Sequence, residues 1–153
     1  MNISQKKLEK SKGRLEIKIK DQNLQKLYQQ GSLKALMPDF HENLKQLMLI
    51  NTAGGITSGD EYNYDIEIDK SDLCISTQAA EKIYSGFGDP ANLVINLNLS
   101  NNSMKGACNS LCNLSRLRRI QFQKNRMHSI PERIGNLKEL EYINVADNEL
   151  KLF

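Results

Sequence analysis

The feature that most constrains this chain is an internal period of 23 residues in its second half. The pattern L-x-x-L-x-L-x-x-N-x-L, with conservative replacements, starts at Val94, Leu117 and Leu140. A fixed period in this range is typical of architectures in which each unit stacks on the unit before it. The three copies place these residues at equivalent positions: Val94, Leu97, Leu99, Asn102 and Met104; Leu117, Ile120, Phe122, Asn125 and Met127; Leu140, Ile143, Val145, Asn148 and Leu150.

Each copy predicts a short strand that lies parallel to its predecessor, with alternate apolar residues pointing into a shared core. Asn102, Asn125 and Asn148 follow the strands, where side-chain amides can satisfy backbone groups of neighbouring turns, so we expect a structural asparagine ladder. Residues 130–137 contain Pro131 and predict a short helical return. The pattern resembles leucine-rich repeats of the 23-residue, proline-containing type. It predicts a short solenoid over residues 94–153, with the last repeat incomplete.

The outward side chains of these strands form columns on the expected concave face. Such columns are where solenoids usually bind partners, although solvated strand faces are an equally good interpretation. The partner-binding candidates, for an unidentified protein, are Arg119, Gln121, Gln123, Tyr142 and Asn144.

The first part of the chain divides into a basic polar tail, residues 1–12, and a mainly β segment, residues 13–93. Apolar residues alternate with polar ones over residues 15–19 and 62–68, as in half-buried strands. The denser apolar stretch 44–50 predicts a buried strand. It leads into the loop 51–60, whose three glycines indicate tight turns.

Three blocks in this segment carry a family resemblance: LYQQGSLK at 27–34, NTAGGITSGD at 51–60 and STQAAEKIYS at 76–85. Their order and spacing are similar to the nickel-urease accessory proteins of the UreD type. The resemblance covers about residues 13–103, the first third of such a protein. Ser32 stands where the family usually has proline, and Ser85 where arginine is common. The family's tryptophan-containing motif is replaced by residues 104–108, so the junction with the repeats lies between about 92 and 104.

The resemblance implies a truncated stack of β-strands that works without catalysis. It implies a maturation protein that joins other urease accessory proteins to apo-urease and assists nickel insertion through protein contacts. We expect truncation to impair this function. It implies no tightly bound cofactor, only transient nickel. The alternative is a leucine-rich-repeat interaction module with no role in urease maturation.

Four residues of the first segment are site candidates. Asp60 and then Thr77 are the best candidates for polar groups along a nickel path, since oxygen ligands are compatible with such a cation. The alternative for Asp60, which we favour, is that it caps a turn or accepts backbone hydrogen bonds. Lys82 and Tyr84 are candidates for a partner surface, and the alternative is a strand edge that leads into the turn at residues 86–90.

Other function classes find little support in the sequence. No catalytic set of Ser, His and Asp or of Cys and His is evident, so we expect no enzyme. The three cysteines and two histidines show no metal-ligand spacing, and an odd cysteine count without a secretory signal argues for reduced thiols in the cytoplasm. The excess of basic residues lies within residues 92–153, which makes nucleic acid a minor option. No apolar run is long enough for a membrane span.

Overall fold

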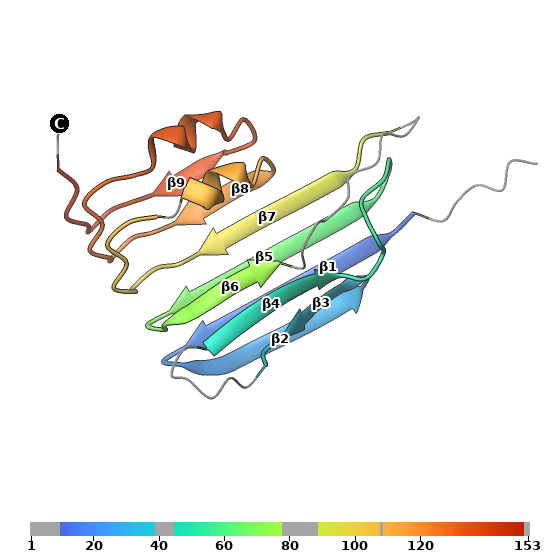
Figure 1. Cartoon of the computed structure of the whole chain (residues 1–153), viewed down its shortest axis with the longest axis horizontal. Coiled ribbons are helices and arrows are strands. Elements are labelled where there is room, and N and C mark those ends of the chain that lie inside the picture. Colours follow the sequence, from blue (N-terminus) through green and yellow to red (C-terminus); the bar gives the residue numbers. More distant parts are fainter. Residues whose placement is uncertain (1–9, 39–44, 78–88, 108, 152–153) are drawn as a thin grey trace, which may run out of the picture.

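The computed structural model describes residues 10–38, 45–77, 89–107 and 109–151, whose strands form two layered sheets (Figure 1). The predicted β-rich character is confirmed, and the helical elements among these residues are two short 3-10 helices, η1 and η2. The elements are β1 (Lys12–Lys20), β2 (Asn23–Gly31), β3 (Leu33–Leu36), β4 (Lys45–Asn51), β5 (Glu61–Asp69), β6 (Leu73–Thr77), β7 (Asn92–Asn98), η1 (Asn109–Asn113), β8 (Leu117–Gln121), η2 (Glu132–Asn136) and β9 (Tyr142–Asn144).

The larger sheet has the strand order β2-β1-β5-β7-β8-β9, and the smaller sheet has the order β3-β4-β6. In the larger sheet β2 is antiparallel to β1, whereas the successive strands β1, β5, β7, β8 and β9 run parallel to one another. From β4 to β7 the chain alternates between the two sheets, one strand in each in turn. After β7 the alternation stops, because β8 pairs beside β7 in the larger sheet.

One row of aliphatic residues crosses the five parallel strands of the larger sheet. The register aligns Ile17, Ile66, Leu97, Ile120 and Ile143 as successive neighbours. The predicted in-register stacking of Leu97, Ile120 and Ile143 is therefore confirmed. The expected boundary between residues 93 and 94 falls inside β7, which pairs with β5 on one side and β8 on the other.

The register also corrects one position of the repeat pattern. Leu117 pairs with Ile95 and not with Val94, because the pairing of β7 and β8 is irregular between Ile95 and Asn96. The alternation of the strand puts Ile95 on the same face as the buried Leu97, so Ile95 takes the place predicted for Val94.

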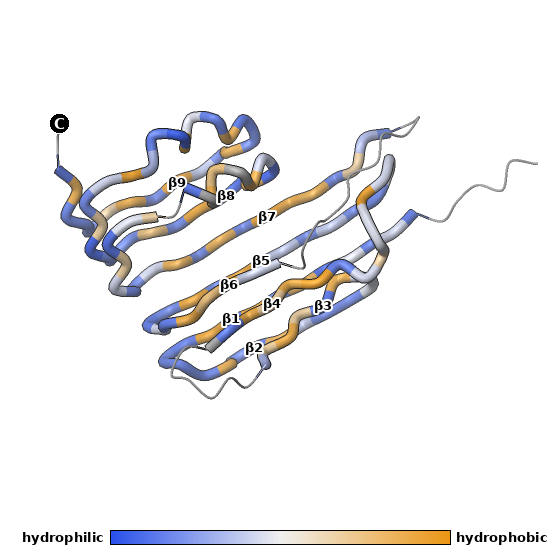
Figure 2. Tube along the Cα trace, viewed as in Figure 1, coloured by the Kyte–Doolittle hydropathy of each residue, from blue (hydrophilic) through white to orange (hydrophobic). Residues whose placement is uncertain are grey.

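Two apolar clusters hold the sheets together, with hydrophobic residues along the strands and hydrophilic residues at the turns (Figure 2). The first lies between the sheets and includes Leu15, Leu33 and Leu47. The second joins Ile66 of β5 to buried residues of the repeats, including Phe122. Burial of a side chain such as Phe122 contributes about 1.5 to 3 kcal/mol, so this shared cluster couples the two parts of the chain.

The stretch 44–50 is less buried than predicted. It forms β4, but of its described side chains Leu47 is fully buried while Met48, Leu49 and Ile50 are partly exposed. β2 lies in the segment predicted to be mainly β, although its sequence shows no apolar alternation that would single it out, and all its residues are exposed.

The segments that connect successive repeat strands follow the same 23-residue period as the strands. η1 and η2 begin at Asn109 and Glu132 and each spans five residues, so their bounds differ by 23 at both ends. Pro131 is the N-cap residue of η2, as its position in the predicted helical turn suggests.

The asparagine ladder forms in the structure. The Nδ2 of Asn125 donates to the carbonyls of Leu99 at 2.9 Å and Phe122 at 2.8 Å, and its Oδ1 accepts the Met104 N–H at 3.0 Å. Asn148 repeats these bonds one turn later, to the Phe122 carbonyl and the Met127 N–H. Each amide thus satisfies backbone groups on two successive turns.

The first asparagine of the ladder binds the N-terminal segment instead of a preceding repeat. Asn102 donates to the Ile68 carbonyl at 2.8 Å and accepts the Ser71 N–H at 2.9 Å. These two groups belong to the end of β5 and the turn before β6. The turn between β5 and β6 therefore takes the place that a repeat corner takes for Asn125.

A column of left-handed residues marks the same corner on each parallel strand of the larger sheet. In-register pairing places Asp21, Lys70, Asn101, Lys124 and Asp147 at equivalent positions just beyond the strands, and φ lies between 47° and 57° at each. Side chains other than glycine, asparagine and aspartate rarely adopt this conformation. The column carries no clear sequence signal, since two of its five members are lysine.

Candidate functional site

The outward face of the larger sheet carries two polar rows that run through the N-terminal strands and the repeats. Because side chains alternate along a strand, these rows lie opposite the buried aliphatic row. The strand registers define the first row as Tyr28, Glu16, Asp65, Asn96, Arg119 and Tyr142, and the second as Lys26, Lys18, Glu67, Asn98, Gln121 and Asn144. Four of the predicted partner-binding residues thus belong to a face that extends well beyond the repeats.

Neighbours within the rows interact across the strands. The Nδ2 of Asn96 donates to Oδ1 of Asp65 at 2.6 Å, which links β7 to β5. The guanidinium of Arg119 lies 5.4 Å from the ring centroid of Tyr142, within the range of a cation–π contact. The fifth candidate, Gln123, contacts Gln121 through its amide nitrogen at 3.5 Å. Arg119 and Tyr142 are therefore neighbours across the strands, as are Gln121 and Asn144, and their role in partner binding stays a prediction.

A hollow of about 530 Å³ lies in this face, lined by side chains of β1, β2, β5, β7 and β8. At its N-terminal side Glu16 forms ion pairs with Lys26 and Arg14. The hydrogen bond from Lys26, aided by the charge of Arg14, lowers the pKa of the Glu16 carboxyl below its ordinary value. At its other side the hollow is lined by Arg119 and Gln121, so it carries acidic, basic and amide groups together.

Asp60, the first nickel-path candidate, is 1% exposed and its carboxylate holds backbone groups. Its Oδ1 accepts the Ser11 N–H at 2.9 Å, and its Oδ2 accepts the Thr57 N–H at 2.8 Å. The Tyr62 hydroxyl lies 3.4 Å from the same Oδ2. These bonds tie the glycine loop to the start of β1, in the arrangement of the alternative that we favoured from the sequence.

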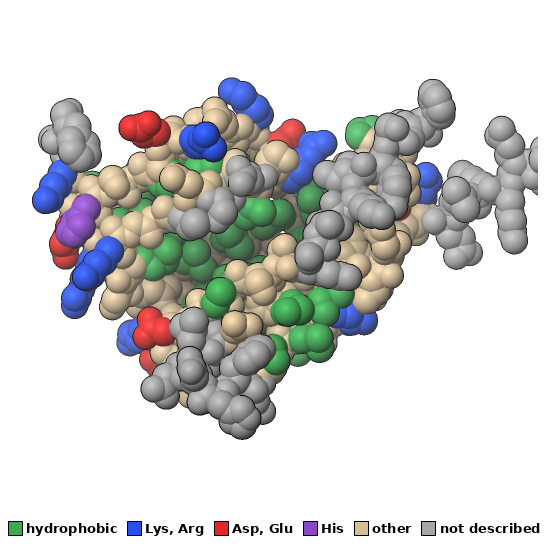
Figure 3. All heavy atoms as spheres, viewed as in Figure 1, with side chains coloured by type: hydrophobic (Ala, Val, Ile, Leu, Met, Phe, Trp, Pro, Cys, Tyr) green, Lys and Arg blue, Asp and Glu red, His purple; other side chains and the backbone are tan. Residues whose placement is uncertain are grey.

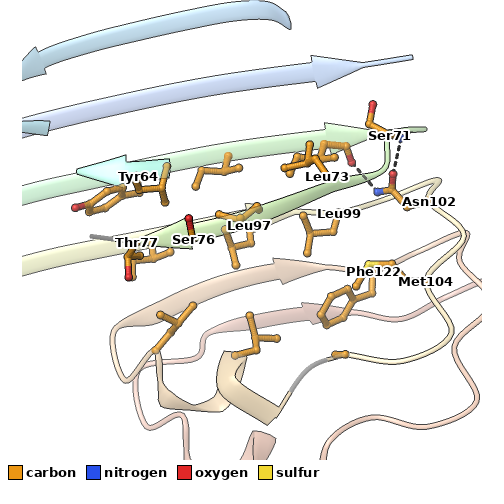
Figure 4. A pocket seen from close by; sticks show the side chains of 18 of the residues that line it. Tyr64, Ser71, Leu73, Ser76, Thr77, Leu97, Leu99, Asn102, Met104 and Phe122 are labelled. Carbon is orange, nitrogen blue, oxygen red and sulfur yellow. Dashed lines mark hydrogen bonds between the residues drawn. The ribbon is translucent and has the colours of Figure 1, made fainter. Parts of the chain in front are cut away.

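Thr77, the second candidate, is exposed at one end of a groove of about 810 Å³. The groove lies between β6 and η1, and hydrophobic side chains line this hollow in the surface (Figure 3). Thr77 and Ser76 lie at one end and Asn102, Met104 and Phe122 lie towards the other (Figure 4). Asp60 does not line this groove, so the structure does not bring the two candidates together in it.

Lys82 and Tyr84 lie outside the described residues. Within the described ranges, no group of three or more His, Cys, Asp or Glu side chains is placed to hold a metal ion. Among the same residues, no helix is long and apolar enough to cross a membrane.

Comparison with known proteins identifies the layered part of the structure. The sequence model of the UreD urease accessory protein family matches residues 11–105. The chain belongs to this family. The match contains every strand from β1 to β7 and reaches Asn102, the first member of the asparagine ladder. The UreD resemblance predicted over residues 13–103 is confirmed, whereas the leucine-rich-repeat class of residues 94–153 stays a prediction.

Curated relatives agree with the UreD match. The urease accessory protein UreD of Chelativorans sp. (strain BNC1) is 39% identical over 82 residues, which cover 52% of this chain and 30% of the relative. UreD of Mesorhizobium japonicum is 38% identical over 80 residues, 52% of this chain and 29% of the relative. UreD 1 of Brucella anthropi is 38% identical over 88 residues, 56% of this chain and 31% of the relative. The chain thus spans about three tenths of the length of these UreD relatives.

Proposed function

We propose that this UreD-family chain acts in urease maturation as a protein-contact component, without catalysis of its own. The observation that carries this proposal is the unbroken polar face of the larger sheet. It combines UreD-family strands with the repeat strands β8 and β9 on one surface. A surface that mixes charged, amide and aromatic side chains suits a wet, specific protein interface.

The partners that we propose for this face are other urease accessory proteins and apo-urease. The residues available for contact are Arg119 and Tyr142 of the repeats, together with Tyr28 of β2. Arginine and tyrosine are enriched among interface residues that contribute strongly to binding. Nickel insertion would then be assisted by holding proteins together.

The nickel path through Asp60 and Thr77 stays a prediction. Its support is that both residues belong to the blocks that resemble UreD. Passage past Asp60 would require nickel to compete with two backbone N–H groups for the same oxygens. Transient passage is compatible with this, because strong nickel sites normally include imidazole or thiolate ligands.

A copurification experiment tests the proposed contact. The full chain is mixed with apo-urease and the other accessory proteins of a urease cluster that contains a UreD relative, and the complexes are separated by size. We expect the chain to elute with them, and Arg119→Glu to weaken retention by at least about tenfold, equivalent to 1.4 kcal/mol. Lys138→Glu makes the same charge change at an exposed residue beyond η2 and is the matched control. Equal retention of both variants, or no coelution of the unchanged chain, would contradict the proposal.

The second candidate is an interaction module that has no urease role. The observation in its favour is that Arg119 and Tyr142, with Gln121 and Asn144, form adjacent pairs on repeat strands alone. Solenoid proteins commonly bind partners through such strand faces. If Arg119→Glu abolished binding to another protein while urease maturation was unchanged in cells, this second function would replace the first.

A further inference from the structure

The smaller sheet has a free edge at β6, where no described strand continues the sheet. Among the described residues β6 pairs with β4, and no strand pairs with its other edge. Alternation between the sheets, continued after β7, would have placed the next strand beside β6. The chain instead returns through η1 to β8 in the larger sheet. Among the described residues, no strand occupies the position next to β6.

The position beside β6 is also an apolar groove. Its floor is the inner face of β7, where Leu93 and Ile95 are only partly buried. Its walls are β6, with Ile75 36% exposed, and the return segment that carries Met104 and Leu111. Figure 4 shows side chains from both walls pointing into this space. Partly exposed apolar side chains beside unpaired main-chain groups are the two features that an added strand needs.

We propose that this groove binds an extended segment of another polypeptide, which adds to the free edge of β6 as a fourth strand of the smaller sheet. Main-chain hydrogen bonds to β6 would provide affinity, and alternate apolar side chains would fill the space above Leu93 and Ile95. The volume of about 810 Å³ lies within the range of known peptide and ligand clefts.

The charges of the groove define the occupant further. Asp72, just before β6, is its single ionisable acidic or basic lining residue among those described, apart from the weakly acidic Tyr64. An occupant with several charges would leave them unpaired on an apolar floor. The segment that fits is uncharged, alternates apolar and small polar residues, and carries one basic residue at the end near Asp72. This inference concerns the opposite face of β7 from the polar rows, so it does not depend on the proposed function.

A designed peptide tests the groove in the full chain. The probe is acetyl-Lys-Val-Thr-Val-Thr-Val-Thr-amide, and its control has proline in place of the central valine, which removes a main-chain donor and breaks the strand. Binding is measured by isothermal titration calorimetry and by hydrogen exchange of residues 73–77. We expect saturable binding of the probe, at least about tenfold slower exchange in β6, and at least about tenfold weaker binding of the proline peptide.

Two matched variants locate the binding edge. Ile75→Lys puts an unpaired charge in the groove and should weaken binding by at least about tenfold. Leu36→Lys makes the same kind of change on β3, the other outer strand of the sheet, at a residue 54% exposed, and should leave binding unchanged. The comparison of the two peptides on the unchanged chain remains decisive if a variant does not fold.

Several results would overturn the proposal. They are no saturable binding of the probe, equal weakening by both lysine variants, or β6 amides that are already protected before peptide is added. A dimer that Ile75→Lys dissociates in sedimentation would assign the groove to a second copy. Binding of decanoate, without peptide protection of β6, would assign it to a small apolar ligand.

Discussion

The N-terminal strands β1 to β6 and the repeats bury the apolar inner face of the larger sheet under different structural elements. Both lay parallel strands side by side in one sheet, with aliphatic side chains on the inner face. In the N-terminal part that face is covered by a second sheet, β3-β4-β6. In the repeats it is covered by the return segments with η1 and η2, through residues such as Leu111 and Leu137. The sheet is common to both parts, and the cover is not.

The difference shows which features must match for two such parts to share a core. The strand register and the corner are continuous, since Ile66 aligns with Leu97 and Asn102 binds the turn after β5 as Asn125 binds a repeat corner. The elements that cover the inner face change from a sheet to 3-10 helical segments, while the strand register and the corner stay continuous. The change leaves the groove above β7, where neither cover is complete.

The largest test of this comparison is the removal of a shared core side chain. Phe122 belongs to the repeats but lies in the same cluster as Ile66 and Ile68 of β5. Phe122→Ala should lower the free energy of unfolding by about 3 to 5 kcal/mol, through lost burial and a cavity. We expect a single urea transition, with faster hydrogen exchange in β5 as well as in β8.

The matched control for this change is Leu15→Ala, which removes a fully buried side chain from the cluster between the sheets. It should cost about 2 to 5 kcal/mol. If each variant destabilised only its own part, in a separate transition, the two parts would be independent units and the comparison would fail.

A second test compares two members of the asparagine ladder. Asn125→Ala should cost about 1 to 3 kcal/mol, because it leaves buried backbone groups unpaired. Asn102→Ala should cost a similar amount, although its partners are Ile68 and Ser71 of the N-terminal part. Gln121→Ala, on the outer face, should cost almost nothing. Thermal shifts that are equal for Asn125→Ala and Gln121→Ala would exclude the structural role of the ladder.

The sequence predicts those features of the fold that repeat. The 23-residue period predicts the stacking of Leu97, Ile120 and Ile143, and the asparagines predict a ladder, because each position recurs with the same chemistry. Alternation predicts β1 and β5, whose inward residues are buried. The two polar columns of the repeats follow from the same strand assignment.

Other features depend on contacts between distant segments and carry no local signal. The polar rows extend to Tyr28 and Glu16 only because β1, β5 and β7 pair in register. The irregular pairing that exchanges Ile95 for Val94 follows from how β7 meets β8. The groove exists because β6 lacks a second neighbour among the described strands, which no residue of β6 reveals.

A third test relieves backbone strain in the corner column. Lys124 has φ of 56°, whereas its equivalents in the adjacent repeats are Asn101 and Asp147, which tolerate this conformation better. Lys124→Gly should raise the free energy of unfolding by about 0.5 to 1 kcal/mol. Lys138→Gly, at a residue outside the left-handed region, should be slightly destabilising. A loss of stability on Lys124→Gly would mean that the corner does not strain the chain.

The smallest effect concerns pH and the N-terminal strands. The pKa of Glu16 is lowered in the folded state, so the carboxylate contributes stability above its ordinary pKa, and this contribution is lost as the pH falls through the lowered value. Glu16→Gln should therefore differ most from the unchanged chain near neutral pH and converge with it in acid. Urea midpoints across this range measure the difference, which added salt should reduce. Glu132→Gln, on η2, removes one carboxylate from a distant part of the chain and is the control for the loss of a negative charge.

The linear order of the parallel strands has a consequence for how the molecule comes apart. Each inner strand is held from two sides, whereas β9 pairs with β8 alone among the described strands, and its Tyr142 and Ile143 are well exposed. Opening of such an array proceeds from an end, because breaking a middle strand would separate two interfaces at once. Thermal fluctuations and proteases therefore reach the two end strands, β2 and β9, before the inner strands β5 and β7. The polar face would then lose the tyrosines at its two ends, Tyr28 and Tyr142, before the acidic residues at its centre.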